Sequence, residues 1–243
     1  MAAADRPRGL FVTGTDTGVG KTLVGAALAR LLAQRGLKVG VCKPVESGVA
    51  DPSLPGPDAR LLGQAAGCDA PAEIVAPYRL RKPLAPDQAA RAEGVRLDLA
   101  VIERAAAQLA GSCDFLIVEG AGGLMAPLTG GFLMADLARQ LGLPLLIVAR
   151  HDLGTINHTL LTTFAARQME LPVAGIILNR LPEHPDEAQR NAPHAIASLA
   201  SADLLASLPE VFGEPMQQVE ELANHLQHSP TLPWLLAAIG AQS

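Results

Sequence analysis

Short apolar runs alternate along the chain with longer segments in which apolar residues recur at helical spacing. The runs resemble buried strands and lie at Leu10–Val12, Val39–Cys42, Phe115–Val118, Leu145–Val148 and Val173–Leu178. The helical segments are Gly20–Gln34, Leu97–Leu109, Leu133–Leu141 and Thr155–Gln168. Because parallel strands are joined by right-handed crossovers that are usually helices, this order predicts an α/β fold: a three-layer sandwich with a mostly parallel sheet.

Glycines follow three of the helical segments and precede strands. We therefore expect Gly36, Gly111 and Gly142 to adopt the left-handed conformation that ends a helix. The segment Asp51–Pro57 (DPSLPGP) has the composition of a linker, but strand-helix alternation continues on both sides of it. We expect one domain over residues 1–243, with a motif-bearing core from about residue 9 to residue 210.

Composition favours a folded protein without a polyanionic partner. Apolar residues make up 49% of the 243 positions and charged residues 18%, which is far from the composition of disordered chains. The net charge is -5, and no Lys or Arg follows Arg190, so nucleic acid and anionic lipid are disfavoured. Without a signal-peptide core or a run of about 18–20 apolar residues, we expect a cytoplasmic location and no membrane span.

Cysteine and histidine positions do not suggest a metal site. Cys42, Cys68 and Cys113 are odd in number and widely spaced, so we expect three small buried hydrophobes rather than a disulfide framework or a zinc site. The histidines also lack metal-ligand spacing and are expected to be solvated or to cap helices. They are His151, His158, His184, His194, His225 and His228.

A glycine-rich segment, Gly14–Thr22 (GTDTGVGKT), follows the first strand and opens a helix. Backbone N–H groups in such a loop form an anion site, the lysine reaches the terminal phosphates, and the Thr22 hydroxyl is suited to Mg²⁺. Five residues, rather than the usual four, separate Gly14 from the GK pair, so this is a variant phosphate loop. A glycine-rich turn without a ligand is the alternative, but it gives no packing reason for Lys21 and Thr22 to follow Gly20.

A second motif, FLIVEGAGG, ends a strand with Glu119 and a flexible turn. The carboxyl ends of parallel strands line the ligand crevice, so Glu119 is expected to face the phosphates. Since Mg²⁺ prefers one or two carboxylates with phosphate and water oxygens, Glu119, Asp58 and Thr22 are candidate ligands. Helix capping is the alternative for both Glu119 and Asp58.

The third motif, KPVESG, begins with Lys43 at the end of the second strand. A lysine that merely lined a core would be costly, whereas one facing an anionic reacting group is useful. Ser47 can donate to the same ligand. An exposed lysine before a Pro-containing turn is the alternative.

Together with DLGTINHT at Asp152–Thr159, these motifs resemble dethiobiotin synthetase, a family of the variant P-loop NTPase superfamily, from about Gly9 to Pro209. The resemblance implies a homodimeric ligase of biotin biosynthesis that converts 7,8-diaminononanoate, CO2 or bicarbonate, and MgATP into dethiobiotin, ADP and phosphate. It implies a carbamate, then a carbamic-phosphoric anhydride, then closure of a cyclic urea by the second amine.

The resemblance also implies roles for individual residues. Lys21 and Lys43 would be catalytic, and Thr22, Asp58 and Glu119 would bind Mg²⁺. The ATP-binding residues would be Gly18, Val19, Gly20, Lys21, Thr22, Leu23, Asp58, Glu119, Gly122, Asn179, Leu208 and Pro209. Asn179 would contact adenine, while Leu208 and Pro209 would form the wall of the base pocket. The substrate residues would be Thr17, Ser47, Gly154, Thr155 and Asn157. Two positions depart from the family pattern: Ala85, where a serine is frequent, and Gly18, where some relatives carry an acid.

The DLGTINHT segment is interpreted as a site shared between two subunits. A helix that starts near Thr155 offers free N–H groups and a positive dipole end to the substrate carboxylate. The resemblance implies that this carboxylate comes from a substrate in the partner's site. An ordinary helix start capped by Thr155 is the alternative.

The main competing function is a partition or septum-positioning ATPase of the same superfamily. Such switch proteins carry a lysine five residues before the GK lysine, where this chain has Asp16, and they rely on basic surfaces or a basic amphipathic tail. A corrinoid-amidating ligase fits less well because it needs a glutaminase domain. A pure binding module also fits less well, since it does not need the second lysine.

Overall fold

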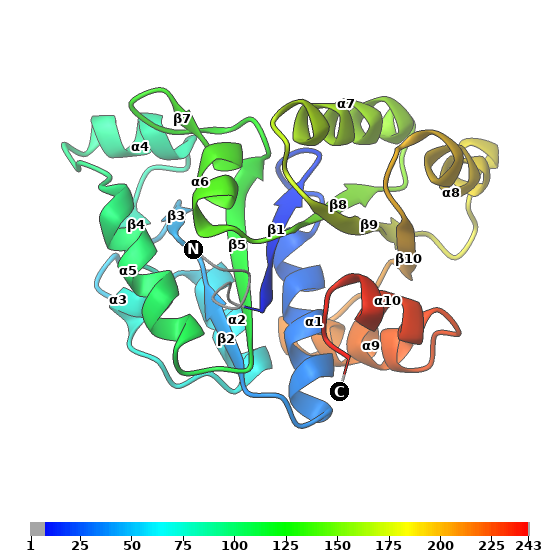
Figure 1. Ribbon diagram of the computed structural model, residues 1–243, viewed down its shortest axis with the longest axis horizontal. Coiled ribbons are helices and arrows are strands. Elements are labelled where there is room, and N and C mark those ends of the chain that lie inside the picture. The colour runs from blue at the N-terminus through cyan, green and yellow to red at the C-terminus, as the bar shows by residue number, and fades with distance from the viewer. Residues whose placement is uncertain (1–7, 243) are drawn as a thin grey trace.

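The computed structural model describes residues 8–242 and contains a central six-stranded sheet, which Figure 1 shows between helices. The strand order is β10-β9-β8-β1-β5-β2, and all neighbouring pairs are parallel. The strands are β1 (Gly9–Gly14), β2 (Val39–Cys42), β5 (Phe115–Gly123), β8 (Leu145–Arg150), β9 (Val173–Leu181) and β10 (Leu204–Pro209). Two small sheets pair β3 (Val45–Ser47) with β4 (Tyr78–Leu80) and β6 (Pro127–Thr129) with β7 (Phe132–Leu133).

Helices cover both faces of the central sheet. One hydrophobic cluster includes residues of α1 (Lys21–Gln34), α2 (Pro57–Ala66), α3 (Ala72–Val75), α9 (Pro215–Gln227) and α10 (Leu232–Ala238). The other includes residues of α4 (Pro86–Ala92), α5 (Leu99–Ala110), α6 (Met134–Leu141), α7 (Thr155–Gln168) and α8 (Glu187–Leu199). Within β1, Leu10 and Val12 belong to the first cluster and Phe11 to the second. A strand buried on both faces explains the continuous apolar runs.

The predicted three-layer α/β sandwich is confirmed, and each of the five predicted strands is present. The sixth strand, β10, was not predicted; it lies at an edge of the sheet and contains both buried and half-buried residues. Gly36 and Gly142 have positive φ as expected. The prediction for Gly111 was wrong, because this residue ends α5 with a φ of -73° and needs no left-handed conformation.

The position of β1 decides where a ligand can bind. Its neighbours are β5 on one side and β8 on the other, so the chain continues to opposite sides of β1. In open parallel sheets, the crevice at such a switch point lies outside the carboxyl ends of the strands. The Gly14–Thr22 loop and the end of β5 therefore face the same crevice. Within residues 8–242, no helix is both long and apolar enough to cross a membrane.

Candidate active site

The Gly14–Thr22 loop connects β1 to α1 and forms the base of the site. Gly20 precedes α1 with a φ of 94°, and a Cβ at this position would approach the Asn179 amide nitrogen closer than 3.0 Å. Glycine is thus required here for both its φ and its lack of a side chain. The Asn179 amide donates to the backbone oxygen of Val19 at 3.1 Å, so a side chain of β9 holds the loop.

Lys21 is the first residue of α1 and lies almost entirely below the surface, with 7% of the residue exposed. Its Nζ donates to the backbone oxygen of Asp16 at 3.1 Å. Burial lowers the pKa of Lys21, and the Glu119 carboxylate partly opposes this effect. A buried ammonium at a helix N-terminus is well suited to a polyphosphate.

Lys43 follows β2 and links two carboxylates at the carboxyl edge of the sheet. Its Nζ forms ion pairs with Asp58, at 2.9 Å, and with Glu119. Glu119 in turn accepts a hydrogen bond from the Thr22 hydroxyl at 2.9 Å. Burial alone would lower the pKa of Lys43, but the charges of Glu119 and Asp58 outweigh burial and raise it. The three motifs predicted from the sequence therefore meet in one charged network.

The carboxylate and hydroxyl oxygens of this network are suitable ligands for Mg²⁺. Glu119 is fully buried, and its Oε2 has no hydrogen-bond partner among the described residues. An unpaired buried carboxylate oxygen beside the Thr22 hydroxyl and the Asp58 carboxylate is a suitable start for a Mg²⁺ shell. Residues 8–242 contain no cluster of three or more His, Cys, Asp or Glu side chains arranged for a metal.

These groups line a cleft of about 550 Å³. Its lining includes the predicted residues Thr17, Gly18, Gly20, Lys21, Thr22, Leu23, Lys43, Ser47, Asp58, Glu119 and Gly122. The motifs thus converge on one concave surface, with a volume in the range of small-molecule sites.

Other predicted residues do not line this cleft. Val19, Asn179 and Leu208 are buried, and Pro209 is half-buried at the end of β10. Gly154, Thr155 and Asn157 lie at the start of α7 and are also not among the lining residues. Their predicted contacts with adenine and substrate stay predictions.

The start of α7 differs from the alternative interpretation, an ordinary helix start capped by Thr155. Gly154, with a φ of 94°, occupies the N-cap position, so Thr155 does not cap the helix with its side chain. Thr155 is instead 2% exposed, and Asn157 is exposed. The free N–H groups of this first turn are not satisfied by a side-chain cap.

Sequence reasoning missed eight residues that line the cleft: Val45, Glu46, Pro57, Leu61, Ala121, Arg180, Pro215 and Gln218. Arg180 follows Asn179 at the end of β9 and has an unusual φ of 64°, whereas Pro215 and Gln218 belong to α9. Of these last three residues, only Arg180 could have been found from the sequence, because it follows a predicted strand and so lies at the carboxyl edge of the sheet. Nothing in the pattern of α9 indicates that it reaches the cleft.

Glu46 is the best-defined of the missed residues. It is 3% exposed, and its carboxylate accepts hydrogen bonds from the backbone N–H of Asp58 at 2.7 Å and of Ala59 at 3.3 Å. Burial raises the pKa of Glu46, the bond from the Asp58 N–H opposes this shift, and the Asp58 charge adds to it.

Two expectations about titratable residues were incorrect in part. His151 is 1% exposed rather than solvated, its ring nitrogens have no hydrogen-bond partner within residues 8–242, and burial lowers its pKa. His228 does cap a helix, through a 2.9 Å contact between Nδ1 and the Asn224 backbone oxygen.

The three cysteines are not all buried as expected. Cys42 is buried, which raises its pKa to about 12, but Cys68 and Cys113 are only half-buried. All three cysteines are free.

Comparison with known proteins gives close matches in sequence. A family model described as an AAA domain matches residues 8–212. The ATP-dependent dethiobiotin synthetase BioD of Anaeromyxobacter dehalogenans (strain 2CP-C) is 50% identical over 205 residues, covering 83% of this chain and 90% of the relative. The ATP-dependent dethiobiotin synthetase BioD of Bacillus subtilis (strain 168) is 39% identical over 204 residues, covering 84% and 88%.

Similar solved structures show the fold. The MinD cell division protein of Aquifex aeolicus has a TM-score of 0.56 and 16% identity, with 96% of this chain and 95% of that chain covered. A ParA family ATPase from Chlorobium tepidum TLS has the same TM-score and identity, with 95% and 99% covered. At this identity the likeness concerns the arrangement of the sheet and helices, not the activity.

Proposed function

The chain belongs to the family of ATP-dependent dethiobiotin synthetases, and we propose that it closes the ureido ring of dethiobiotin from 7,8-diaminononanoate and CO2. The observation that carries the proposal is Lys43, a buried ammonium held by Glu119 and Asp58 in the same cleft as Lys21. Two lysines in one cleft suit a reaction in which negative charge develops on two groups, a carbamate and a transferring phosphate.

In the proposed reaction, one amine of the substrate adds to CO2 and loses a proton, giving a carbamate. A carbamate oxygen attacks the γ-phosphorus of ATP and ADP leaves, giving the carbamic-phosphoric anhydride. The second amine then attacks the carbamic carbon, and phosphate leaves as the ring closes and that amine loses a proton. The protein forms no covalent bond in these steps, so positioning and charge neutralisation suffice.

The polar residues of the cleft that the sequence predicted each have a role in this scheme. Lys21 and the loop N–H groups bind the ATP phosphates, and Lys43 stabilises charge on the carbamate and on the phosphate that it receives. The Ser47 hydroxyl, at the end of β3, and Thr17 bind the substrate. When bound to Glu119, Asp58 and Thr22, Mg²⁺ would neutralise charge on the phosphate oxygens.

The adenine of ATP is proposed to bind near the end of β9, beside Asn179, Leu208 and Pro209. This position is supported by Asn179, which holds the loop through Val19, and by Arg180, which follows it and lines the cleft. The ATP phosphates and the base would then lie along one path from Gly20 toward α9.

We further propose a homodimer in which the start of α7 completes the partner's site. Gly154, Thr155 and Asn157 do not line the cleft of their own chain, while the α7 N-terminus has free N–H groups suited to a carboxylate. Large apolar residues are exposed before and along α7: Leu153 is 86% exposed, Leu161 58% and Phe164 53%. A partner subunit would cover this apolar surface.

The reaction is tested by following phosphate release and dethiobiotin formation with purified protein, MgATP, bicarbonate and the diamine. Both products are expected, in equal amounts, and only when the diamine is present. Phosphate release that ignores the diamine and rises with DNA or lipid vesicles would instead support a switch ATPase like those that share the fold.

The shared site is tested with heterodimers. A Lys21→Gln chain and a Thr155→Ala/Asn157→Ala chain should each be inactive, whereas their heterodimer should regain activity because one of its two composite sites is intact. No recovery in verified heterodimers of folded parents would mean that the site lies within one chain.

A further inference from the structure

Glu46 connects the KPVESG strand to the first turn of α2. Its Oε1 accepts from the Asp58 N–H at 2.7 Å and its Oε2 from the Ala59 N–H at 3.3 Å. Both N–H groups belong to the helix terminus that has no intrahelical acceptor. A carboxylate at this position also gains from the positive end of the helix dipole.

Helix α2 has no cap of its own. Its N-cap residue is Gly56, which offers no side chain. A Cβ at Gly56 would lie closer than 3.0 Å to the Glu46 carboxylate, although the φ of Gly56 is an ordinary -70°. Glycine is therefore needed here for space, and Gly56 and Glu46 form a matched pair.

The same turn carries Asp58, whose carboxylate lies 2.9 Å from Lys43 Nζ. Asp58 is thus held at two points: its backbone N–H by Glu46 and its carboxylate by Lys43. The segment before it, Asp51–Pro57, is mostly exposed and ends at the first residue of α2. Without the Glu46 carboxylate, the start of α2 would be held by the Lys43–Asp58 ion pair and by the burial of Ala59.

We propose that Glu46 is a positioning residue, which caps α2 from the neighbouring strand and thereby holds the Asp58 carboxylate against Lys43 and the proposed Mg²⁺ site. The effect on catalysis rests on the proposed function, but the effect on α2 does not. Residues that orient metal ligands typically change metal affinity or activity by about 10- to 100-fold when removed.

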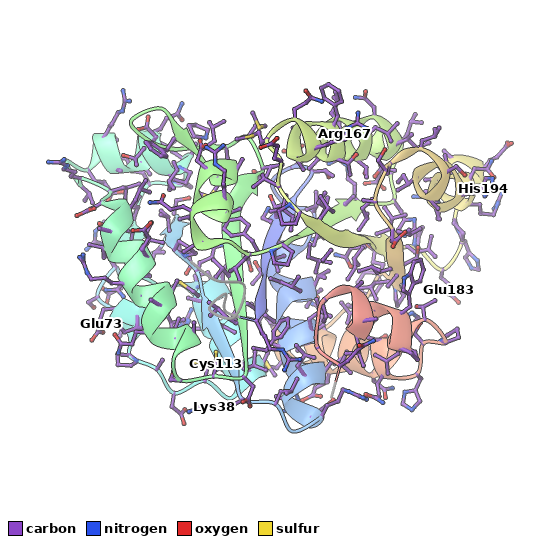
Figure 2. The ribbon with its side chains drawn as sticks, viewed as in Figure 1. Lys38, Glu73, Cys113, Arg167, Glu183 and His194 are labelled. Atoms are coloured by element: carbon purple, nitrogen blue, oxygen red, sulfur yellow. The ribbon has the colours of Figure 1, made fainter. Side chains whose placement is uncertain are left out.

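The first test is amide hydrogen exchange in the protein without nucleotide or Mg²⁺. In Glu46→Ala, the amides of Asp58 and Ala59 should exchange about 10- to 100-fold faster, in line with the loss of a hydrogen bond to a charged group. Glu46→Gln should lie between Glu46→Ala and the native protein. Glu73→Gln is the matched control, since Glu73 is an exposed acid in the first turn of α3 (Figure 2). Unchanged exchange at Asp58 in Glu46→Ala would overturn the proposal.

The second test uses the matched pair. Gly56→Ala should displace the Glu46 carboxylate and speed exchange at Asp58 as Glu46→Ala does. In the Glu46→Ala background, Gly56→Ala should have no further effect, because the clash is gone. If Gly56→Ala sped exchange at Asp58 as much in the Glu46→Ala background as in the native protein, Gly56 and Glu46 would not be a matched pair.

The third test is kinetic. Glu46→Ala should raise the Mg²⁺ concentration for half-maximal turnover about tenfold, with little change in the KM for the diamine. The double variant with Asp58→Ala should be no worse than Asp58→Ala alone. An additive loss in an active enzyme would show that Glu46 acts independently of Asp58. If the native protein makes no dethiobiotin, the proposed function fails, and the exchange measurements still decide the role of Glu46.

Discussion

Lys43→Gln removes a buried ammonium that contacts two carboxylates, so its effect on stability can be worked out from the structure. The side chains of Lys43 and Glu119 are 4% and 0% exposed, and that of Asp58 is 38% exposed. Removing one partner of a buried ion pair costs about 3–5 kcal/mol. The more exposed Asp58 contact adds no more than about 1 kcal/mol. For a chain of this size, each kcal/mol lowers Tm by about 2–4 °C, so the loss of the Lys43–Glu119 pair alone should lower Tm by about 6–20 °C.

Mg²⁺ should reverse part of this loss. Without Lys43, Glu119 and Asp58 lose the ammonium that pairs with both of them, and a divalent cation can replace its charge. We therefore expect Mg²⁺ to raise the Tm of Lys43→Gln more than that of the native protein, measured by circular dichroism with added Mg²⁺ or with a chelator. Lys38→Gln is the matched control: Lys38 is exposed and directly precedes β2, at the lower edge of the molecule in Figure 2, and the change should be within about 0.5 kcal/mol.

Two results would refute this reasoning. A Lys43→Gln protein with the native Tm would mean that the buried charges of Glu119 and Asp58 are compensated by something other than Lys43. If Lys43→Gln had a lowered Tm but Mg²⁺ raised the Tm of both proteins equally, these carboxylates would not be the ligands of the metal. In kinetics, turnover should fall strongly with a smaller change in ATP affinity, and equal losses would contradict the proposed role at the transferring phosphate.

Three more single side chains give testable expectations. Lys21→Gln should fold normally but lose at least about a hundredfold in turnover, measured by phosphate release, because a charge-assisted contact to phosphate is lost; near-native turnover would remove Lys21 from the mechanism. Glu119→Gln should weaken Mg²⁺-dependent ATP binding more than metal-free diamine binding, both measured by calorimetry, and equal losses would indicate a structural role. Burial lowers the pKa of His151, so the native protein should lose stability as the pH falls below 6.5, where the unfolded chain binds this proton more readily. At pH 7 the free energy of unfolding of His151→Phe, measured by denaturant titration, should equal that of the native protein or exceed it by up to about 1 kcal/mol. On acidification, this free energy should fall less in His151→Phe than in the native protein.

The central strands and the loop at the base of the site were predictable because their causes are local. A strand buried on both faces needs a continuous apolar run, and Leu10–Val12 is one. A loop that offers its N–H groups to phosphate needs glycine where φ is positive, as at Gly20. The edge strand β10 gives a weaker signal, since only Leu205 and Leu208 of its residues are fully buried.

Glu46 could not be assigned from the sequence for a different reason. Its partners are backbone N–H groups at Asp58 and Ala59, and backbone groups carry no residue-specific signal. The helix start also lacks the usual capping side chain, because Gly56 stands at the N-cap. The acid in KPVESG and the glycine before Pro57 make sense only when β3 and α2 are side by side. Whether Asp58 and Glu119 merely cap helices is likewise decided by three-dimensional contacts, which place both on Lys43.

The charge state of Lys43 limits the chemistry it can perform in the proposed reaction. Two carboxylates raise its pKa, so Lys43 is held as an ammonium in the protein without metal or nucleotide. A group that holds its proton this firmly stabilises developing negative charge but does not accept a proton from the substrate amines. Lys21 differs, since burial lowers its pKa, but an ammonium in contact with ATP phosphates is also favoured in its charged form. The protons that the two amines lose are therefore expected to leave through water or the departing phosphate, and in this proposal the two lysines would act as fixed positive charges during phosphoryl transfer.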